Sequence, residues 1–376
     1  MTNQTRKRVF SAIQPSGELH IGNYLGALKN FVELQGSYDC FFFIADYHSI
    51  TENYDPKEKP KQIFNLALDF LAAGLDPNKC TIAVQSQVCE HTELAWIFNT
   101  ITPMGLLERM TQYKDKAVRQ KQNINVGLFD YPVLQAADIL IYKAEFVPIG
   151  QDQVQHLELS RNIAHAFNAK FGKTFPEPQP LLTETPKIMS LTDPTKKMSK
   201  SHGPKSYIGI NDSPEMIKEK MKKAVTGSNI KELIDLGARL IPEEEMGIKT
   251  QESSELYLNI KYAKIDKQGN PVFNEESIKA FHIVRNLENI LRNFGTEEHI
   301  KYFTEGFRKQ DIKFSELKEV LAQDIADYFA PLRERRKELE AKPDEVKKIL
   351  SEGAEKARSI ARETMKEVKE KIGLAL

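Results

Sequence analysis

One apolar run constrains the fold of this chain more than any other feature. Residues 40–45 read Cys-Phe-Phe-Phe-Ile-Ala, so a strand formed here has no polar face. Such a strand must be covered on both sides, as the central strands of parallel sheets are. Around it, further apolar runs alternate with segments of helical spacing, at 9–13, 21–34, 60–73, 81–85 and 146–150. This alternation predicts an α/β fold built on an open parallel sheet.

The second half of the chain has a different character. Beyond about residue 204, charged segments with helical spacing dominate, and we expect helices at 214–225, 252–263, 274–294, 314–337 and 343–372. Connections are expected at 175–180, 227–249 and 265–272, and a short strand at 187–191. The sequence therefore predicts a first domain over 1–204 with a helical insertion near 91–142, a helical domain over 205–342, and a C-terminal helix over 343–376 that packs back on the first domain. Within the insertion, Pro132 is expected in the first turn of a helix that ends near Tyr142.

Composition excludes several classes of protein. The 53 Lys and Arg residues balance 53 Asp and Glu residues, so any contact with nucleic acid must come from a local basic patch. The three cysteines, Cys40, Cys80 and Cys89, have no Cys-x-x-Cys spacing, which argues against a disulfide framework, a zinc site or an iron–sulfur cluster. We expect no signal peptide, because residues 1–8 are polar and basic with no apolar run behind them, and we expect no membrane span, because the apolar runs are too short to cross a bilayer. We expect a cytoplasmic protein with no metal held by its side chains.

The turn after the first expected strand is suited to a nucleotide. Residues 14–23 read Gln-Pro-Ser-Gly-Glu-Leu-His-Ile-Gly-Asn. Gly17 allows a tight turn, Gly22 leaves room for a ligand, and the start of the following helix offers N–H groups to phosphates. His20 and Asn23 add polar groups. A simple capped helix start explains the same residues, and neither GxGxxG nor the P-loop pattern is present.

A basic loop forms the second motif. Residues 197–201 read Lys-Met-Ser-Lys-Ser, in a loop bracketed by Pro194 and Pro204. Lysines on a loop can close over pyrophosphate and stabilise the charge that develops on it. The alternative is a charged loop that faces only water.

Together, the two motifs resemble the HIGH and KMSKS signatures of class I aminoacyl-tRNA synthetases, in the same order. Longer segments resemble bacterial-type tryptophanyl-tRNA synthetases over nearly the whole chain: 10–17, 44–51, 107–112, 131–140, 147–156, 189–201 and 352–357. About 227–313 matches poorly. The resemblance implies a Rossmann-like doubly wound parallel sheet with a mostly α-helical second domain. It also implies an enzyme that uses ATP to activate tryptophan and passes it to tRNA(Trp).

The resemblance assigns an ATP site with Mg²⁺ to the two motifs. The residues that it implies for ATP are Gln14, Pro15, Ser16, Gly22, Asn23, Gly150, Gln151, Asp152, Ile188, Lys197, Met198, Ser199, Lys200 and Ser201. Gln14, His20, Lys197 and Lys200 are the expected catalytic residues, and Lys114 and Lys116 could assist. The attacking carboxylate is already ionised at neutral pH, so positioning and charge stabilisation suffice and no general base is needed.

The expected tryptophan site lies on one face of the helix near residue 135. Tyr131, Gln135 and Asp138 are spaced four and three residues apart and share that face. An indole N–H needs an acceptor, and the Asp138 carboxylate would serve. Phe10, Val147 and Ile149 would form apolar walls. Gln153 would bind the ammonium or carboxylate of the amino acid, and His48 would lie near the pocket. For Phe10, Val147 and Ile149, ordinary core packing is an equal explanation.

Three other functions stay open from the sequence. Position 135 is Gln where many tryptophan enzymes carry Met, and tyrosine enzymes pair a Gln with an Asp three residues later, which keeps a tyrosine–tRNA ligase as an alternative. Gln151 also replaces an acidic residue common in its segment. A nucleotidyltransferase of the same fold that acts on a small molecule would lack the complete lysine loop and the helical half. A non-catalytic RNA-binding paralogue would have no need of the intact motifs.

The resemblance also implies partners. It implies a homodimer, with helices around 91–120 at the interface, and anticodon recognition by the helical half. Basic residues available for RNA are Lys218, Lys220, Lys222, Lys223, Arg333, Arg335 and Arg336, although charged helices usually face only water.

Overall fold

The computed structural model describes residues 6–110, 125–150, 153–182, 187–226, 275–309 and 311–375, with four short strands between 238 and 272. The chain divides into two compact units. Unit 1 comprises Met1–Leu19, Tyr24–Thr185 and Glu334–Leu376, and unit 2 comprises His20–Asn23 and Pro186–Arg333. These bounds differ from the expected ranges: residues 20–23 of the first motif and the whole lysine loop group with the helical half, whereas residues 14–19 belong to unit 1.

Unit 1 is built on a five-stranded parallel sheet with the order β3-β2-β1-β4-β5. Its strands are β1 (Arg8–Ile13), β2 (Asp39–Ile44), β3 (Cys80–Val84), β4 (Phe146–Ile149) and β5 (Gln179–Leu182). The apolar run at 40–45 forms the inner strand β2, whose residues 40–44 are fully buried. The predicted α/β class is confirmed. The chain winds outward from β1 in both directions, so the order reverses between β1 and β4, and ligands bind at such a point.

The fifth strand was not predicted. Residues 175–180 were expected to be a connection, yet β5 begins at Gln179 and pairs with β4. Pro180 has no N–H to donate, so a segment that contains it does not look like a strand in the sequence. At the edge of a sheet, however, a strand tolerates proline.

Helices cover the sheet of unit 1. They are α2 (Lys29–Leu34), α3 (Asp46–Ser49), α4 (Lys59–Ala72), α5 (Glu90–Asn99), α6 (Met104–Glu108), α8 (Val126–Leu140), α9 (Val154–Phe171) and α16 (Pro343–Ile372), with a π-helical stretch at Tyr24–Leu28. Helix α8 starts earlier than predicted, because the Asn125 side chain accepts the Leu128 N–H at 2.9 Å and caps it. Pro132 therefore lies inside the helix rather than in its first turn.

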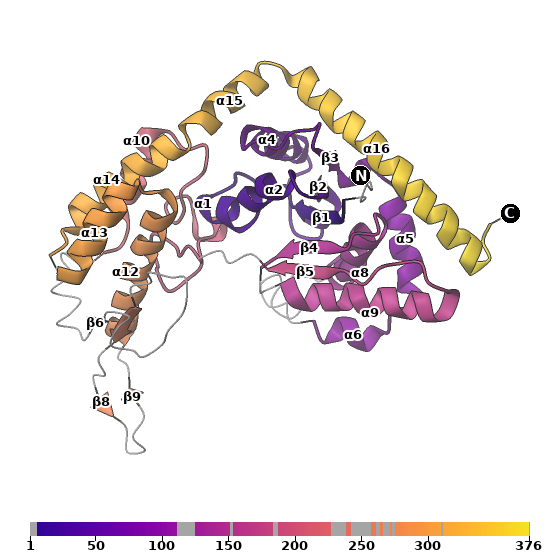
Figure 1. The fold of residues 1–376 in the computed structure, drawn as a ribbon, viewed down its shortest axis with the longest axis horizontal. Coiled ribbons are helices and arrows are strands. Elements are labelled where there is room, and N and C mark those ends of the chain that lie inside the picture. The colour runs from indigo at the N-terminus through magenta and orange to yellow at the C-terminus, as the bar shows by residue number, and fades with distance from the viewer. Residues whose placement is uncertain are drawn as a thin grey trace, which may run out of the picture. The chain divides into compact units, whose positions relative to one another are not determined.

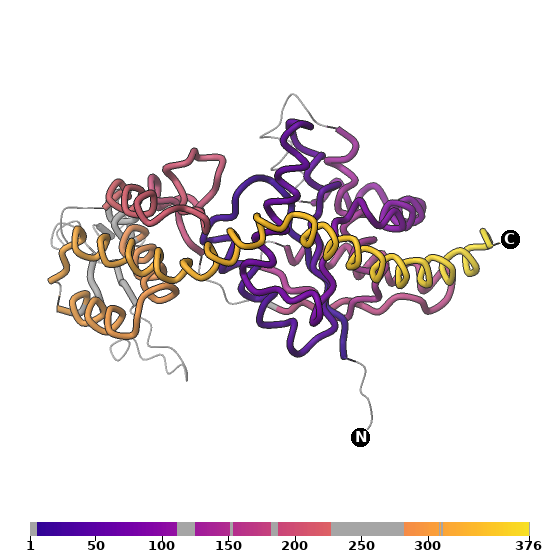
Figure 2. Tube along the Cα trace, turned by 90° about the horizontal axis from the view of Figure 1, so that it is seen from above, coloured from indigo at the N-terminus to yellow at the C-terminus, as the bar shows by residue number. Residues whose placement is uncertain are grey.

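Helix α16 covers the edge strand β3 (Figure 1), and it also contacts α4 and α5. The view from above shows it running along the same unit (Figure 2). At the crossing, a Cβ on Gly353 would lie 1.9 Å from the Ile82 carbonyl oxygen, so only glycine allows this approach. Ion pairs tie the helix down, including Arg362–Glu90 at 3.1 Å and Lys369–Glu93 at 2.6 Å.

Unit 2 is mostly helical. Its helices are α1 (Ile21–Asn23), α10 (Pro214–Lys223), α12 (Glu275–Phe294), α13 (Glu297–Lys309) and α14 (Phe314–Tyr328), and α15 (Ala330–Glu340) continues into unit 1. Antiparallel pairs join β6 (Ala238–Ile241) to β7 (Tyr257–Ile260) and β8 (Lys264–Ile265) to β9 (Pro271–Val272). The helix predicted at 252–263 is therefore wrong, since β7 occupies its centre. The helix predicted at 314–337 is interrupted at Phe329.

Among the described residues, no helix combines the length and the apolar character required to cross a bilayer.

Candidate functional site

The carboxyl ends of β1 and β4, in unit 1, carry the first group of predicted residues, at the point where the strand order reverses. Gln14 follows β1, and Gly150 follows β4. The Ser16 N–H donates to the Gln14 carbonyl at 2.9 Å, and Gly17 has φ +99°, which confirms the tight turn. The Lys59 ammonium donates to the Pro15 carbonyl at 3.2 Å. Lys59 was missed from the sequence, because its contact joins residues 44 positions apart.

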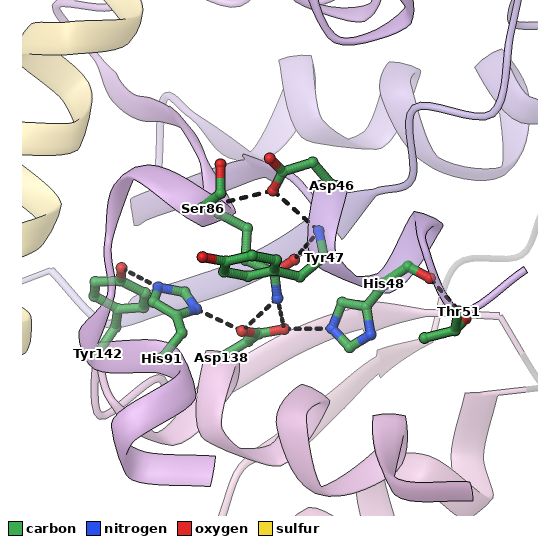
Figure 3. Close-up of polar contacts among 9 residues, drawn as sticks. Asp46, Tyr47, His48, Thr51, Ser86, His91, Asp138 and Tyr142 are labelled. Carbon is green, nitrogen blue, oxygen red and sulfur yellow. Dashed lines mark hydrogen bonds and ion pairs between the residues drawn. The ribbon is translucent and has the colours of Figure 1, made fainter. Parts of the chain in front are cut away.

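Asp138, on α8, lies at the centre of a buried network in unit 1. Figure 3 shows its carboxylate between His48 and His91, with Tyr142 beyond His91. His48 Nε2 lies 2.7 Å from Oδ2, and His91 Nδ1 lies 2.5 Å from Oδ1. The Gln85 amide donates to both oxygens, at 2.8 and 2.9 Å. His91 Nε2 also lies 2.6 Å from the Tyr142 hydroxyl, so that ring is held at both nitrogens.

The surroundings of Asp138 keep its carboxyl group ionised. Burial alone would raise its pKa, but the adjacent His48 and His91 outweigh burial and lower the pKa to about 2. The amide of Gln85 is oriented by the Tyr47 N–H, which donates to its oxygen at 3.1 Å. The carboxylate is thus a fixed anion with three donor groups around it, and 2% of Asp138 is exposed.

The other predicted tryptophan residues also lie in unit 1. The Tyr131 hydroxyl is 2.9 Å from His156 Nε2, and burial, followed by the charge of Glu52, raises the pKa of this phenol to about 12. Gln135 is half-buried one helical turn from Tyr131 on α8. Phe10, Val147 and Ile149 belong to the hydrophobic core, where Phe10 stacks on Tyr142. Gln153 is half-buried immediately before α9.

The start of α1, in unit 2, holds His20 in one orientation. His20 and Asn23 bond reciprocally: the His20 N–H donates to Asn23 Oδ1 at 3.2 Å, and the Asn23 N–H donates to His20 Nδ1 at 3.1 Å. Because Nδ1 accepts a hydrogen bond, the ring is neutral with its proton on Nε2. Burial, then the charges of Lys200 and Lys197, lower the pKa of His20 to about 4. A Cβ on Gly22 would lie 3.0 Å from His20 Nδ1, so this glycine makes room for the histidine ring.

Main-chain pairing joins the first signature motif to residues 208–209, which follow the lysine loop in the chain. The Ile21 N–H donates to the Ile208 carbonyl at 3.0 Å, and His20 forms an antiparallel bridge with Gly209. Residues 207–209 could not be recognised from the sequence, because they pair with residues 20–21 through main-chain groups, which do not depend on the type of side chain. The pairing explains why residues 20–23 belong to unit 2.

The lysine loop starts from a short hairpin. Met189 and Lys197 form an antiparallel bridge, with bonds from the Ser190 N–H to the Lys196 carbonyl (2.8 Å) and from the Met198 N–H to the Ile188 carbonyl (2.9 Å). The predicted strand at 187–191 is thus reduced to one side of this bridge. Met198 is buried, Lys197 is exposed and Lys200 is half-buried. The side chains of Ser199 and Ser201 lie 2.9 Å apart, at the start of a 3₁₀ turn over Lys200–His202.

Comparison with known proteins decides the family. The profile of the tRNA synthetases class I (W and Y) matches residues 2–330. The tryptophan–tRNA ligase of Caldanaerobacter subterraneus subsp. tengcongensis is 42% identical over 98% of this chain and 99% of that protein. The chain belongs to the bacterial-type tryptophanyl-tRNA synthetases. The tryptophan–tRNA ligase of Helicobacter pylori is 39% identical over 98% of the chain and 99% of its own length.

A solved structure supports the same family. The tryptophanyl-tRNA synthetase from Campylobacter jejuni, crystallised with ADP and tryptophan, has a TM-score of 0.75 and 35% sequence identity, and covers 98% of this chain and 100% of its own. The predicted Rossmann-like class is therefore confirmed.

The predicted residues fall into two groups within this synthetase. His20, Gly22, Asn23, Ile188 and residues 197–201 lie in unit 2, whereas Gln14, Pro15, Ser16, Gly150 and all predicted tryptophan residues lie in unit 1. Four predicted residues, Lys114, Lys116, Gln151 and Asp152, lie outside the described residues. Gln85, His91 and Tyr142 were missed, because nothing in their local sequence indicates that they surround Asp138.

Proposed function

We propose that this chain activates tryptophan with ATP, releasing pyrophosphate, and then transfers the tryptophanyl group to the terminal adenosine of tRNA(Trp). The substrate carboxylate attacks the α-phosphorus and the bond to the pyrophosphate oxygen breaks, so no proton has to be removed. The observation that carries the proposal is the main-chain pairing of residues 20–21 with residues 208–209, just beyond the lysine loop, where the charges of Lys200 and Lys197 help to lower the pKa of His20. This is the electrostatic setting that a triphosphate requires.

His20 acts on the phosphates as a neutral donor. Its Nδ1 is occupied by the Asn23 N–H, so the proton on Nε2 is the one available to a phosphate oxygen. A neutral ring with a fixed tautomer donates one directed hydrogen bond, and its donor geometry does not change over the physiological pH range.

Lys197 and Lys200 stabilise the leaving pyrophosphate. Charge accumulates on the β- and γ-phosphates as the bond breaks, and two ammonium groups beside them favour that state over the ground state. Mg²⁺ enters with ATP as part of the substrate and is held by phosphate oxygens. Met198 is buried and fixes the loop between the two lysines, while the Ser199 and Ser201 hydroxyls offer further donors.

The remaining ATP contacts come from main chain and small side chains. Gln14, Pro15 and Ser16 follow β1, and Gly150 follows β4, at the edge of the sheet where nucleotides bind in doubly wound folds. Gln151 and Asp152 complete this group in the proposal, and Ile188 contacts the nucleoside.

Asp138 accepts the indole N–H of tryptophan. The accepting atom is Oδ2, because Oδ1 lies against the completely buried His91, whereas Oδ2 lies against His48, whose side chain is 7% exposed. Tyr131 and Gln153 bind the ammonium and carboxylate of the substrate, with Gln135 beside the ring. Phe10, Val147 and Ile149 contribute apolar surface while they serve the core.

Tryptophan is favoured over tyrosine by the relatives, whose full-length matches are tryptophan–tRNA ligases. The deciding experiment is ATP–pyrophosphate exchange with each amino acid in turn. We expect exchange with tryptophan and none above background with tyrosine. Exchange that depends on tyrosine, or on neither amino acid, would contradict the proposal.

The protein is proposed to act as a homodimer. Three apolar side chains on α5, α6 and α8 are largely exposed: Trp96 (72%) on α5, Met104 (62%) on α6, and Val126 (79%) at the start of α8. An interface that covered these side chains would remove their apolar surface from water. Trp96 is the single tryptophan of the chain, so its fluorescence reports on assembly. We expect Trp96→Lys to shift the sedimentation coefficient from that of a dimer to that of a monomer.

tRNA(Trp) is proposed to bind the helical unit through a smaller basic surface than the sequence suggested. Lys220 is unsuitable, because its ammonium lies 2.6 Å from the buried Asp212 carboxylate and the side chain is 12% exposed. Arg336 is equally unsuitable, because it is paired with Asp69 and Asn65 of unit 1. The Arg333 guanidinium is bonded to the Ala326 carbonyl. Lys218, Lys222 and Lys223 remain exposed on α10 of unit 2, and Arg335 is exposed on the part of α15 that belongs to unit 1.

A further inference from the structure

A side chain of α12 binds the backbone of the lysine-loop hairpin. The Met189 N–H donates to Asn286 Oδ1 at 2.7 Å, and Asn286 Nδ2 donates to the Met189 carbonyl at 3.1 Å. The two residues are 97 positions apart in the chain, and Asn286 is 4% exposed. One amide therefore satisfies both main-chain groups of a single residue.

The geometry of the hairpin explains why these groups are available. In an antiparallel pair, residues alternate between those whose N–H and C=O face the partner strand and those whose groups face away. The hairpin bonds are made by Ile188 and Ser190, so the N–H and C=O of Met189 face the opposite edge. Asn286 occupies that edge in the place of a third strand.

The hairpin is in this way attached to the core of unit 2. Asn286 lies between Val284 and Leu287 on α12, and both of these side chains are buried, as is Ile290 one turn further on. On its other side, Met189 faces Lys197, the first lysine of the loop. A rigid helix is therefore connected through one amide to the strand that pairs with the lysine-bearing strand of the hairpin.

We propose that Asn286 is a positioning residue for adenylate formation, which holds the hairpin so that Lys197 and Lys200 reach the pyrophosphate beside His20. The inference rests on the proposed role of the two lysines. Asn286 does not touch the reacting atoms; it acts through the backbone of Met189. It also gives the helical unit, through α12, a direct mechanical connection to the ATP-binding lysines.

The proposal predicts a selective kinetic defect. Removing the amide leaves the N–H and C=O of Met189 without their partner and frees the outer edge of the hairpin. Misplacement of a catalytic group by about 1 Å can cost about 100-fold in rate. We expect Asn286→Ala to lower kcat for tryptophan-dependent ATP–pyrophosphate exchange by about 10- to 100-fold. Tryptophan affinity, measured by equilibrium dialysis without ATP, stays unchanged, because its proposed site lies in unit 1.

Two further variants keep the test independent of folding. Asn286→Asp has the same shape and keeps the acceptor for the Met189 N–H, but it places an oxygen against the Met189 carbonyl, so we expect a similar loss of rate. Asn293→Ala is the matched control on the same helix, where the amide only donates to the Asn289 carbonyl at 2.7 Å. This control should exchange pyrophosphate at the wild-type rate.

A double-mutant cycle with Lys200→Ala identifies the route of the effect. If Asn286 acts through the loop lysines, the double variant is little slower than Lys200→Ala alone, whereas independent effects multiply. Multiplying effects, or a wild-type rate in both Asn286 variants, would overturn the inference. If Lys200→Ala itself leaves exchange unchanged, the proposed lysine role fails instead, so the two failures are distinguishable.

Discussion

The Asp138 network makes a quantitative prediction for Asp138→Asn. This substitution keeps the shape of the side chain and removes its charge. Hydrogen bonds to an ion contribute about 1.5–3 kcal/mol each, against about 0.5–1.5 kcal/mol for neutral pairs. In addition, one oxygen becomes an NH₂ group that faces a donor, either His48 on one side or His91 on the other. We expect the free energy of unfolding of unit 1 to fall by about 2–4 kcal/mol.

The lowered pKa of Asp138 corresponds to a stabilisation of the same sign. A pKa lowered from 3.8 to about 2 corresponds to about 2 kcal/mol in favour of the folded, ionised state. Because the folded pKa is the lower one, this stabilisation is complete above about pH 4 and disappears as the pH falls toward 2. The stability difference between wild type and Asp138→Asn should therefore shrink as the pH falls from about 4 toward 2.

Urea unfolding followed by far-ultraviolet circular dichroism measures the stability. The matched control is Asp130→Asn on the same helix, where the carboxylate accepts one hydrogen bond, from Asn99 at 2.9 Å. We expect this control to lose about 1 kcal/mol or less. Equal stability of the two variants would refute the argument that the carboxylate is held as a buried anion.

Pyrophosphate exchange tests the proposed role of Asp138 in binding the substrate. Loss of the charged acceptor should lower kcat/KM for tryptophan by about 10- to 100-fold. The benzothienyl analogue, in which sulfur replaces the indole N–H, should be used equally well by wild type and variant. An undiminished preference of Asp138→Asn for tryptophan over this analogue would refute the assignment.

Three more predictions concern other parts of the chain. Lys200→Ala should slow tryptophan-dependent pyrophosphate exchange by about 100- to 1000-fold without weakening tryptophan binding, and an unchanged exchange rate would contradict the role of the lysine. The pKa of His20, lowered to about 4, should leave kcat free of any His20 titration from pH 8 to pH 5; an inflection near pH 6.5 that disappears in His20→Asn would contradict a neutral ring. The low folded pKa also means that this histidine costs stability as the pH falls from 6.5 toward 4, which urea unfolding can measure against His20→Asn. Gly353→Ala should lower the free energy of unfolding by about 1–3 kcal/mol, although alanine favours a helix over glycine by about 1 kcal/mol. The control is Gly36→Ala, whose Cβ would meet nothing within 4 Å. A Gly353→Ala variant more stable than wild type would contradict the close packing of Gly353 against Ile82.

The sheet was predictable where burial dominates the local sequence. Strands β1 to β4 are apolar runs, and covered parallel strands have no alternative to such a composition. The sequence of β5 contains Pro180, and the sequence of β7 has no regular alternation of apolar and polar residues. Both strands therefore depend on pairing with a neighbouring strand, which leaves only a weak pattern in the local sequence. Pro132 led to a wrong prediction of where α8 begins. The capping residue, Asn125, lies seven residues before the proline.

The residues of the candidate site were predictable only where they are neighbours in the sequence or share one face of a helix. His20, Asn23 and residues 197–201 stand together in the chain, and Tyr131 and Asp138 share a helix face. The partners of Asp138 come from three separate elements, and Gln85 and His91 carry no local mark of that contact. Charge alone also overstated the basic surface, because a lysine or arginine reads the same in a sequence whether it faces water or, like Lys220 and Arg336, a buried carboxylate.

The position of α16 has a consequence for how the chain is made. Ribosomes deliver residues in order, and α16 emerges only after every strand of the sheet and the whole helical unit. Until then the outer edge of β3 presents unpaired N–H and C=O groups, which can recruit strands of other molecules. The nascent first unit is therefore a natural client for chaperones, and a ribosome that stalls shortly before Pro343 would release a sheet prone to aggregation.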